Sequence, residues 1–237
     1  MGRRLSPSEI EAALAAETPE AIVERLSVYI TDARRERIED VLAGRLGSLS
    51  VALENPWDPH NAAAVVRSAE AFGASEVHVI QASTRILRAR KTTAGTHRWV
   101  GLEMHGDLDR FFDRMRNRGI RVAGACVDEA CALEELPMDG PICLLLGNEH
   151  EGLSAAAKSR CDHRYKIPMQ GFAESLNLSV SAAISLYVSS RRRREVIGAR
   201  GDLDAREIAR LRARWYLNSV DARTIRGLAQ RTEALEG

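Results

Sequence analysis

The middle of the chain alternates between short apolar runs and longer segments in which apolar residues recur at helical spacing. The short runs predict strands at 49–53, 77–80, 100–104, 120–125, 142–146 and around Tyr165. The helical spacing predicts helices at 61–72, 108–118 and about 177–194. Strands that alternate with helices are typical of a parallel sheet covered by helices on both faces. We therefore expect an α/β fold built on a mostly parallel sheet.

Both ends of the chain carry helical patterns without strands. A capping box begins at Ser6 and another at Asp204, and each predicts the start of a helix. The patterns divide the chain into an N-terminal helical extension at 1–48, a central domain at 49–194 and a C-terminal helical extension at 195–237.

Composition narrows the class of protein. The 237 residues are 45% hydrophobic, which is enough for one substantial core. No apolar run approaches the ~20 residues of a membrane helix, and no apolar stretch follows the N-terminus as in a secretory signal. We expect a cytoplasmic protein without a membrane partner. The four cysteines form no Cys-x-x-Cys pair and do not cluster with the six histidines, so we expect reduced thiols and no bound metal.

Positive charge is concentrated near the C-terminus. Residues 191–226 hold eleven arginines and five acidic residues, a local net charge of +6 in a chain whose net charge is +1. A basic segment on a nearly neutral protein suits contact with a polyanion through one face. A solvated helix with extra arginines explains the same charge equally well.

Polar residues and glycines gather at three places where a predicted strand gives way to a helix. The three segments are Asn55–Glu70, Pro141–Ser154 and Ile167–Ile184. In the last of them Pro, Gly, Ser and Asn stand directly before a strongly apolar helix, as in a binding loop. Ligands of open α/β sheets bind at the carboxyl ends of strands, so these junctions predict a binding site.

The order and the amino-acid sequences of the three segments resemble the three motifs of the SPOUT family of S-adenosylmethionine-dependent RNA ribose methyltransferases. The resemblance covers about residues 32–194. It implies a homodimer and a deep trefoil knot formed after the strand at 142–146. It also implies that the knot binds S-adenosylmethionine, which agrees with the absence of a Gly-x-Gly-x-x-Gly fingerprint after any predicted strand.

The resemblance gives individual residues a role in catalysis. Arg67 matches the family's catalytic arginine, and Asn61 matches the asparagine that orients it. Because the pKa of arginine exceeds ~12, we expect Arg67 to hold the target phosphate and ribose and to stabilise the developing oxyanion. Three further residues match those that hold the site together: Glu149, Ser175 and Asn177.

Other interpretations of these residues remain open. Arg67 is also explained by a surface ion pair with Glu70, and Ser175 or Asn177 by a plain helix cap. Cofactor binding is expected on the second and third motifs, at Leu146, Gly147, Asn148, Ile167, Pro168, Met169 and Leu176. Apolar walls and main-chain groups suit an adenine, although core packing would also account for Ile167, Met169 and Leu176.

RNA contacts are expected on five basic residues, of which only His60 lies within one of the three segments. The set consists of Arg34, Arg37, His60, Arg191 and Arg193. Arg37, Arg191, Arg193 and the segment Gly95–Trp99 match the branch of the family that methylates guanosine 18 in the tRNA D-loop. His60 also fits a structural role in its Pro-His-Asn turn.

The target of the methyl transfer has alternatives. Residues 55–61 and 149–152 also resemble the ribosomal-RNA branch, which makes a ribosomal-RNA ribose methyltransferase the second hypothesis. A non-catalytic RNA-binding module of the same fold is the third. The expected dimer interface includes the helix at 177–194, because its apolar positions exceed what one buried stripe needs: Leu178, Ala182, Leu186 and Val188.

Overall fold

The structure is a computed structural model that describes residues 4–81, 95, 98–128 and 130–228. The chain forms two compact units. One unit is residues 45–202 and contains the sheet. The other combines the described parts of 1–44 and 203–237, so that helices from both ends of the chain pack together.

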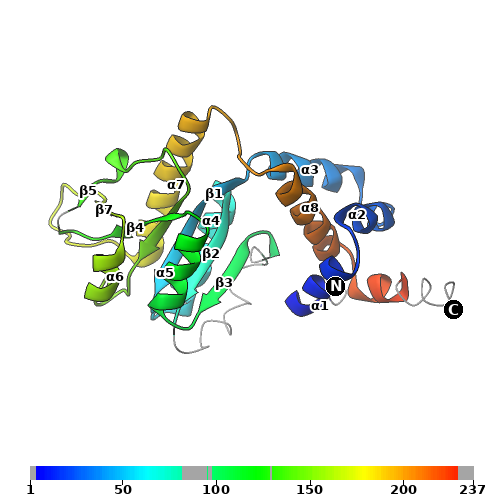
Figure 1. Cartoon of the computed structure of the whole chain (residues 1–237), viewed down its shortest axis with the longest axis horizontal. Coiled ribbons are helices and arrows are strands. Elements are labelled where there is room, and N and C mark those ends of the chain that lie inside the picture. The colour runs from blue at the N-terminus through cyan, green and yellow to red at the C-terminus, as the bar shows by residue number, and fades with distance from the viewer. Residues whose placement is uncertain (1–3, 82–94, 96–97, 129, 229–237) are drawn as a thin grey trace. The chain divides into compact units, whose positions relative to one another are not determined.

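A parallel sheet forms the centre of the larger unit (Figure 1). Its strand order is β3-β2-β1-β6-β4-β7-β5, and every strand pair in it is parallel. The strands are β1 (Leu46–Glu54), β2 (Ala74–Ile80), β3 (Gly101–His105), β4 (Arg121–Ala125), β5 (Cys131–Ala132), β6 (Ile142–Leu146) and β7 (His163–Lys166). The predicted α/β fold with a mostly parallel sheet is confirmed.

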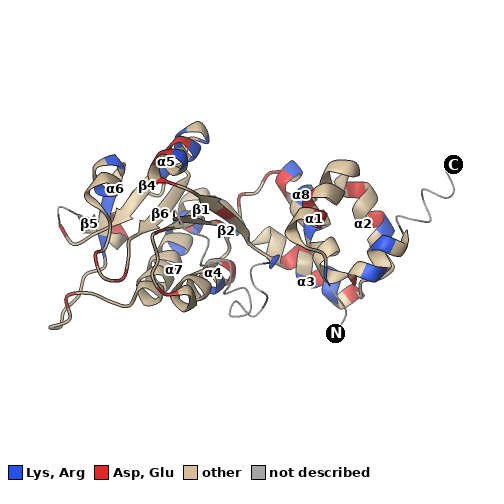
Figure 2. Cartoon of the chain, turned by 90° about the horizontal axis from the view of Figure 1, so that it is seen from below, with Lys and Arg blue, Asp and Glu red and all other residues tan. Residues whose placement is uncertain are grey.

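Helices cover both faces of this sheet. Figure 2 shows α4 (Pro59–Phe72) and α7 (Leu178–Ile197) on one face, and α5 (Leu108–Asn117) and α6 (Ala155–Arg160) on the other. A short 3-10 helix spans Leu133–Glu135.

The strands bury alternate residues on these two faces. Leu144 of β6 packs in the core with Val65 of α4 and Leu186 of α7. The next residue, Leu145, packs in the opposite core with Phe111 of α5. A strand buried on both faces needs a continuous apolar sequence, which explains why the run at 142–146 was a clear signal.

The smaller unit is helical. It contains α1 (Pro7–Ala16), α2 (Pro19–Ser27), α3 (Asp32–Ala43) and α8 (Ala205–Ser219), and residues 222–228 are also helical. Both predicted capping boxes are present, at Ser6 and Asp204. The buried side chains of Ile22 and Trp215 contribute to the core of this unit. Within the described residues, none of the helices combines the length and apolar character needed to cross a membrane.

Strand order determines where the three motif loops lie. β1 and β6 are direct neighbours, with Leu53 opposite Leu146. The loops that follow these strands therefore leave the same edge of the sheet at adjacent points. The trefoil knot implied by the family resemblance stays a prediction.

Candidate active site

Glu149 is the centre of a hydrogen-bond cluster that joins two of the motif loops. Its Oε1 accepts from the side-chain amide of Asn61 at 2.9 Å and from the backbone N–H of Asp58 at 3.2 Å. Its Oε2 accepts from the backbone N–H of Trp57 at 2.8 Å. Glu149 comes shortly after β6, whereas the three donors lie in the loop after β1 and the first turn of α4. The carboxylate therefore fixes one loop against the other.

The same hydrogen bonds determine the charge of Glu149. Partial burial by itself would raise the pKa of this carboxyl group. The hydrogen bonds from Asn61 and from the backbone N–H groups of Trp57 and Asp58 outweigh burial, and the pKa lies below its usual value. Glu149 is thus ionised at neutral pH, and its hydrogen bonds are charge-assisted.

Asn61 also reaches the third motif loop. Its Oδ1 accepts from Asn177 Nδ2 at 3.2 Å. Asn177 is the N-cap of α7, because its Oδ1 accepts from the backbone N–H of Ser179 at 2.8 Å and of Val180 at 3.4 Å. Asn177 is therefore a helix cap, and the same side chain also contacts the first motif loop. Contacts run from Glu149 through Asn61 to Asn177 and link all three loops.

The loop after β6 closes so tightly that only glycine fits at its start. A Cβ atom on Gly147 would lie 2.0 Å from the carbonyl carbon of Gly152. Asn148 and Gly152 exchange two backbone hydrogen bonds of 3.0 and 2.9 Å. The Asn148 side chain donates to the backbone carbonyl of Asn55 at 2.7 Å. Asn55 has φ of 45°, a left-handed conformation that asparagine tolerates better than most residues.

Glu54 supports the same loop, and the sequence analysis missed it. This last residue of β1 is 4% exposed. Its carboxylate accepts from the backbone N–H of Ser154 at 2.9 Å and from the Ser154 hydroxyl at 2.6 Å. An acidic residue at the end of an apolar strand was the available signal, since a carboxylate is rarely buried without partners.

Arg67 lies on α4, six residues after Asn61, with its side chain exposed. Within the described part of the chain its guanidinium makes no hydrogen bond or ion pair. The alternative ion pair between Arg67 and Glu70 is not formed. Oε1 of Glu70 instead lies 3.7 Å from Nη2 of the buried Arg45. Asn61 donates to Glu149 and accepts from Asn177, and it is connected to Arg67 only because both residues lie on α4.

The residues predicted to hold the cofactor differ in exposure. Leu146 and Gly147 are buried, and Asn148, Ile167 and Met169 are half-buried. Pro168 and Leu176 are exposed, as is Ser175, whose side chain forms no hydrogen bond with any residue that the structure describes. Ile167 also packs against the core, as the alternative interpretation required. The loop at 167–177 thus presents accessible apolar side chains.

The predicted RNA-binding residues fall into two groups. His60, Arg34, Arg37 and Arg191 have exposed side chains. Arg37 pairs with Asp40 at 3.1 Å, and Arg191 donates to the Tyr187 hydroxyl at 3.3 Å. Thr96 and His97 of the Gly95–Trp99 segment lie outside the described residues.

Arg193 requires a correction. Its side chain is inside the fold, with the residue 8% exposed. Its guanidinium donates to the Ser48 hydroxyl and to the Met138 carbonyl, both at 2.8 Å, and lies 3.6 Å from the Asp202 carboxylate. These partners leave no group for an RNA phosphate, so the structure argues against the predicted RNA contact.

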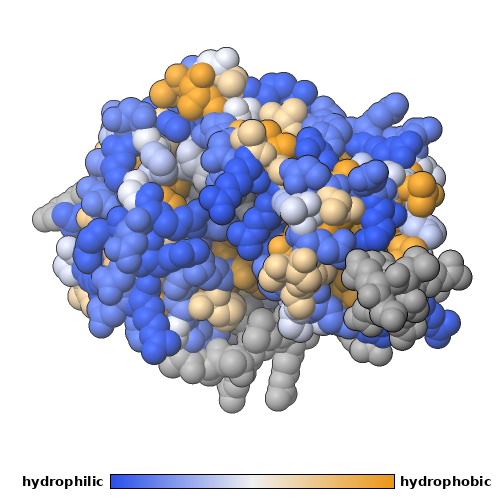
Figure 3. Space-filling model, turned by 45° about the vertical axis from the view of Figure 1, so that its right-hand side comes forward, coloured by the Kyte–Doolittle hydropathy of each residue, from blue (hydrophilic) through white to orange (hydrophobic). Residues whose placement is uncertain are grey.

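The arginines of the basic segment that lie in the helical unit are largely paired. Arg212 forms two hydrogen bonds with Glu39, at 2.6 and 2.7 Å. Glu11 pairs with Arg210 at 3.3 Å and also with Arg214. Figure 2 shows acidic and basic residues interleaved on these helices, and hydrophilic side chains cover most of the face in Figure 3. The local charge of +6 therefore overstates the free positive charge.

The apolar residues of α7 that were predicted to form a dimer interface pack within the chain instead. Leu178, Ala182 and Leu186 are buried in the core of the sheet unit, and Val188 packs against that core. The exposed apolar side chains of α7 include Val180 and Tyr187 instead. The four residues chosen from the sequence are therefore explained within one chain.

Known proteins of similar sequence and fold are RNA methyltransferases. Residues 48–187 match the SpoU rRNA Methylase family. A tRNA (guanosine(18)-2'-O)-methyltransferase of Thermus thermophilus is 39% identical over 164 residues, which cover 69% of this chain and 84% of that protein. The crystal structure of the A. aeolicus TrmH/SpoU tRNA modifying enzyme has a TM-score of 0.71 and 30% identity, covering 80% of this chain and 98% of that one.

A further solved relative contains a ligand. The SpoU methyltransferase AviRb from Streptomyces viridochromogenes, in complex with the cofactor AdoMet, has a TM-score of 0.59 and 28% identity, covering 66% of this chain and 64% of that one. The family match and these relatives identify the chain as a methyltransferase. This chain belongs to the SpoU family of RNA methylases. The predicted family resemblance and the predicted enzyme class are confirmed.

Proposed function

We propose that this protein is an S-adenosylmethionine-dependent RNA ribose 2'-O-methyltransferase that acts on guanosine 18 in the D-loop of tRNA. The observation that carries the proposal is the contact series from Glu149 through Asn61 to Asn177, which brings the three motif loops together. The name of the Thermus thermophilus relative supports the choice of tRNA and of guanosine 18.

The loops around Gly147 fit the cofactor. The missing side chain at Gly147 allows two backbone segments to approach closely. Met169 and Leu176 supply accessible apolar surface for an adenine, and Asn148 holds the neighbouring loop closed through its two backbone hydrogen bonds with Gly152. The bound cofactor supplies an electrophilic methyl group. The residues of this chain have the separate task of placing the ribose oxygen in line with that methyl group.

Arg67 is the residue proposed to act on the RNA. Methylation forms a bond from the ribose 2'-oxygen to carbon and releases the hydroxyl proton. Negative charge grows on that oxygen as the proton leaves, and a guanidinium nearby stabilises it. Arg67 is exposed and makes no ion pair within the described residues, so its charge is available to the phosphate and ribose of the target nucleotide.

Glu149, Asn61 and Asn177 are proposed as positioning residues. Each of them makes at least one side-chain hydrogen bond to another loop. Together they set the distance between α4, which carries Arg67, and the loops proposed to hold the cofactor. Ser175 is exposed beside Asn177, and we assign it a contact with the ligand.

RNA binding beyond the target nucleotide is assigned to Arg34, Arg37, His60 and Arg191, which are exposed. A homodimer in the cytoplasm is part of the proposal. Exposed Val180 and Tyr187 on α7 supply apolar surface for a second copy. Sedimentation should give twice the chain mass of 26.1 kDa, and a monomer with full activity would contradict the dimer.

A ribosomal-RNA ribose methyltransferase is the second candidate, because the family that residues 48–187 match is named as a family of rRNA methylases. Labelled methyl transfer to unmodified bulk tRNA and, separately, to unmodified ribosomal RNA distinguishes the two. We expect incorporation into tRNA alone, on ribose. Incorporation confined to ribosomal RNA favours the second candidate. Incorporation into neither favours a non-catalytic RNA-binding module.

A further inference from the structure

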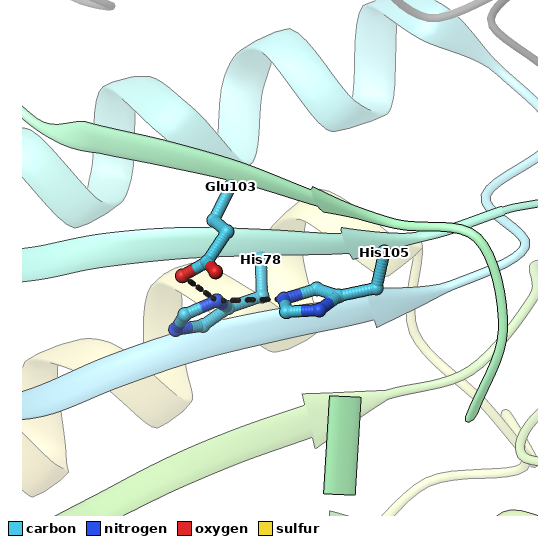
Figure 4. A group of neighbouring side chains, drawn as sticks. All are labelled: His78, Glu103 and His105. Carbon is cyan, nitrogen blue, oxygen red and sulfur yellow. Dashed lines mark hydrogen bonds and ion pairs between the residues drawn. The ribbon is translucent and has the colours of Figure 1, made fainter. Parts of the chain in front are cut away.

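Two histidines and a glutamate meet on the sheet face under α5, away from the three motif loops (Figure 4). His78 lies on β2, and Glu103 and His105 lie on β3. His78 is directly opposite Glu103 in the parallel pairing, and Ile80 is opposite His105. Alternate residues of a strand point to the same face, so all three side chains project to the face that α5 covers.

We propose that His78, Glu103 and His105 bind a divalent transition-metal ion, with zinc as the expected ion. His78 Nδ1 lies 3.2 Å from His105 Nε2 and 3.6 Å from a carboxylate oxygen of Glu103. Ligands about 2.1 Å from a tetrahedral ion are roughly 3.4 Å apart. One ligand atom from each residue lies within 4.8 Å of the other two. The three donors thus have nearly the spacing that the ion requires.

The chemical types of the three donor atoms indicate which ion the cluster would bind. Two imidazole nitrogens and one carboxylate oxygen suit zinc and its neighbours in the transition series. Magnesium and calcium prefer oxygen ligands alone and are disfavoured. Three protein ligands leave one tetrahedral position for water or another small donor.

The surroundings of His78 fit a metal ligand. The residue has 0% exposure, and its second ring nitrogen, Nε2, is buried without a hydrogen-bond partner. The carboxylate of Glu76 lies 3.6 Å from this nitrogen. A metal-bound histidine commonly donates its other N–H to a carboxylate. Coordination through Nδ1 places the proton on Nε2, where a small movement of Glu76 completes the hydrogen bond.

Two arginines, one on α5 and one directly after it, offset the negative charge of the carboxylates around the cluster. Arg114 lies 3.3 Å from one oxygen of Glu103, and the other oxygen of Glu103 faces His78. Arg118 pairs with Glu76. Phe111 covers the two imidazoles, with ring centroids 5.9 Å from His78 and 5.4 Å from His105. An ion held beneath this ring is shielded from bulk water.

The expected effect is structural. Strand β3 lies at the end of the strand order and, among the strands that the structure describes, pairs with β2 alone. The three ligands come from these two strands. An ion therefore cross-links the edge strand to its neighbour. An ion that binds only the folded chain stabilises it, by a factor of about 100 in the folding equilibrium at a free concentration of about 100 times Kd.

The test uses the full-length chain without a histidine tag. After removal of metal with a chelator, the protein is dialysed against Zn²⁺ and its metal content is measured. We expect about one ion per chain, a rise in Tm that a chelator reverses, and visible absorption bands of a tetrahedral site when Co²⁺ replaces Zn²⁺. Wild-type protein that retains no zinc and shows no Co²⁺ bands overturns the proposal, whatever the variants do.

Variants assign the ion to these residues. His105→Gln and Glu103→Gln should lose the bound zinc and the chelator-dependent change in Tm. His163→Gln removes a histidine of β7 and should retain both. Circular dichroism of the chelated proteins checks folding. Equal zinc content in wild type and both ligand variants contradicts the assignment. This test is independent of methyl transfer, so its failure leaves the proposed function untouched.

Discussion

The side-chain amide of Asn61 donates a 2.9 Å hydrogen bond to the carboxylate of Glu149, 88 residues further along the chain. This contact connects the first turn of α4 to the loop after β6. Through its carbonyl oxygen the same Asn61 side chain accepts from Asn177 at the start of α7. One amide group thus joins three loops, and the arrangement of the proposed active site depends on it.

Replacing Asn61 should loosen the whole site. In Asn61→Ala the Glu149 carboxylate and the Asn177 amide each lose one hydrogen bond, and a hydrogen bond of this kind contributes about 0.5–1.5 kcal/mol. We expect lower stability in urea and a loss of both cofactor affinity and turnover. Ser68→Ala on the same helix removes only a local hydrogen bond to Ala64 and serves as the matched control. An Asn61→Ala protein that binds cofactor normally would show that the linkage is unimportant.

Arg67→Ala should separate binding from chemistry. We expect turnover to fall roughly 100-fold or more, the effect of removing an oxyanion-stabilising donor. Cofactor affinity should be retained, because the proposed cofactor residues lie on the other two loops. Calorimetry and labelled methyl transfer on the same preparation measure the two effects. Arg67→Lys keeps the charge and should recover only part of the activity. Unchanged turnover in Arg67→Ala rules out the assigned role.

Much of the fold can be predicted from the sequence. The elements that could not be predicted were missed for physical reasons. The apolar run at 142–146 is buried on both faces and predicts β6 correctly. β5 has two residues and α6 has six, which is too short for a periodic pattern. Their place is determined by neighbouring strands and not by local preference.

The site residues were harder to predict. Asn61, Glu149 and Asn177 are far apart in sequence, and only the family resemblance brought them together. Charge patterning could not distinguish the exposed Arg191 from the buried Arg193. His78 and His105 are separated by 27 residues, so no short motif indicated their contact.

Glu149 should make stability depend on pH on the acid side. Its pKa is lower in the folded protein than the usual value, so the folded state favours the ionised form. The stabilisation is fully present above the unfolded-state pKa of about 4.3 and is lost as pH falls through the lower folded pKa. Urea denaturation across this range should show a smaller acid-side decrease for Glu149→Gln, since glutamine does not titrate. An identical decrease in both proteins would contradict this contribution.

Arg191 and Arg193 form a matched pair of neighbouring arginines. Arg191→Ala should weaken RNA binding and reduce the slope of log affinity against log salt by about 1, while stability is unchanged. Arg193→Ala should instead destabilise the protein by roughly 3 kcal/mol, because it leaves Asp202 and the Met138 carbonyl without their buried partner. Salt-dependent binding and urea denaturation of both variants test the pair. The reverse assignment of effects would restore the original prediction for Arg193.

The central claim is that the methyl group goes to the 2'-oxygen of guanosine 18 in tRNA. Two synthetic tRNAs that differ only at this position, one with guanosine and one with 2'-deoxyguanosine, test it by removing a single oxygen atom. The account predicts labelled methyl transfer to the guanosine form and none to the deoxy form, with both RNAs binding the enzyme. Equal transfer to the two RNAs would contradict it.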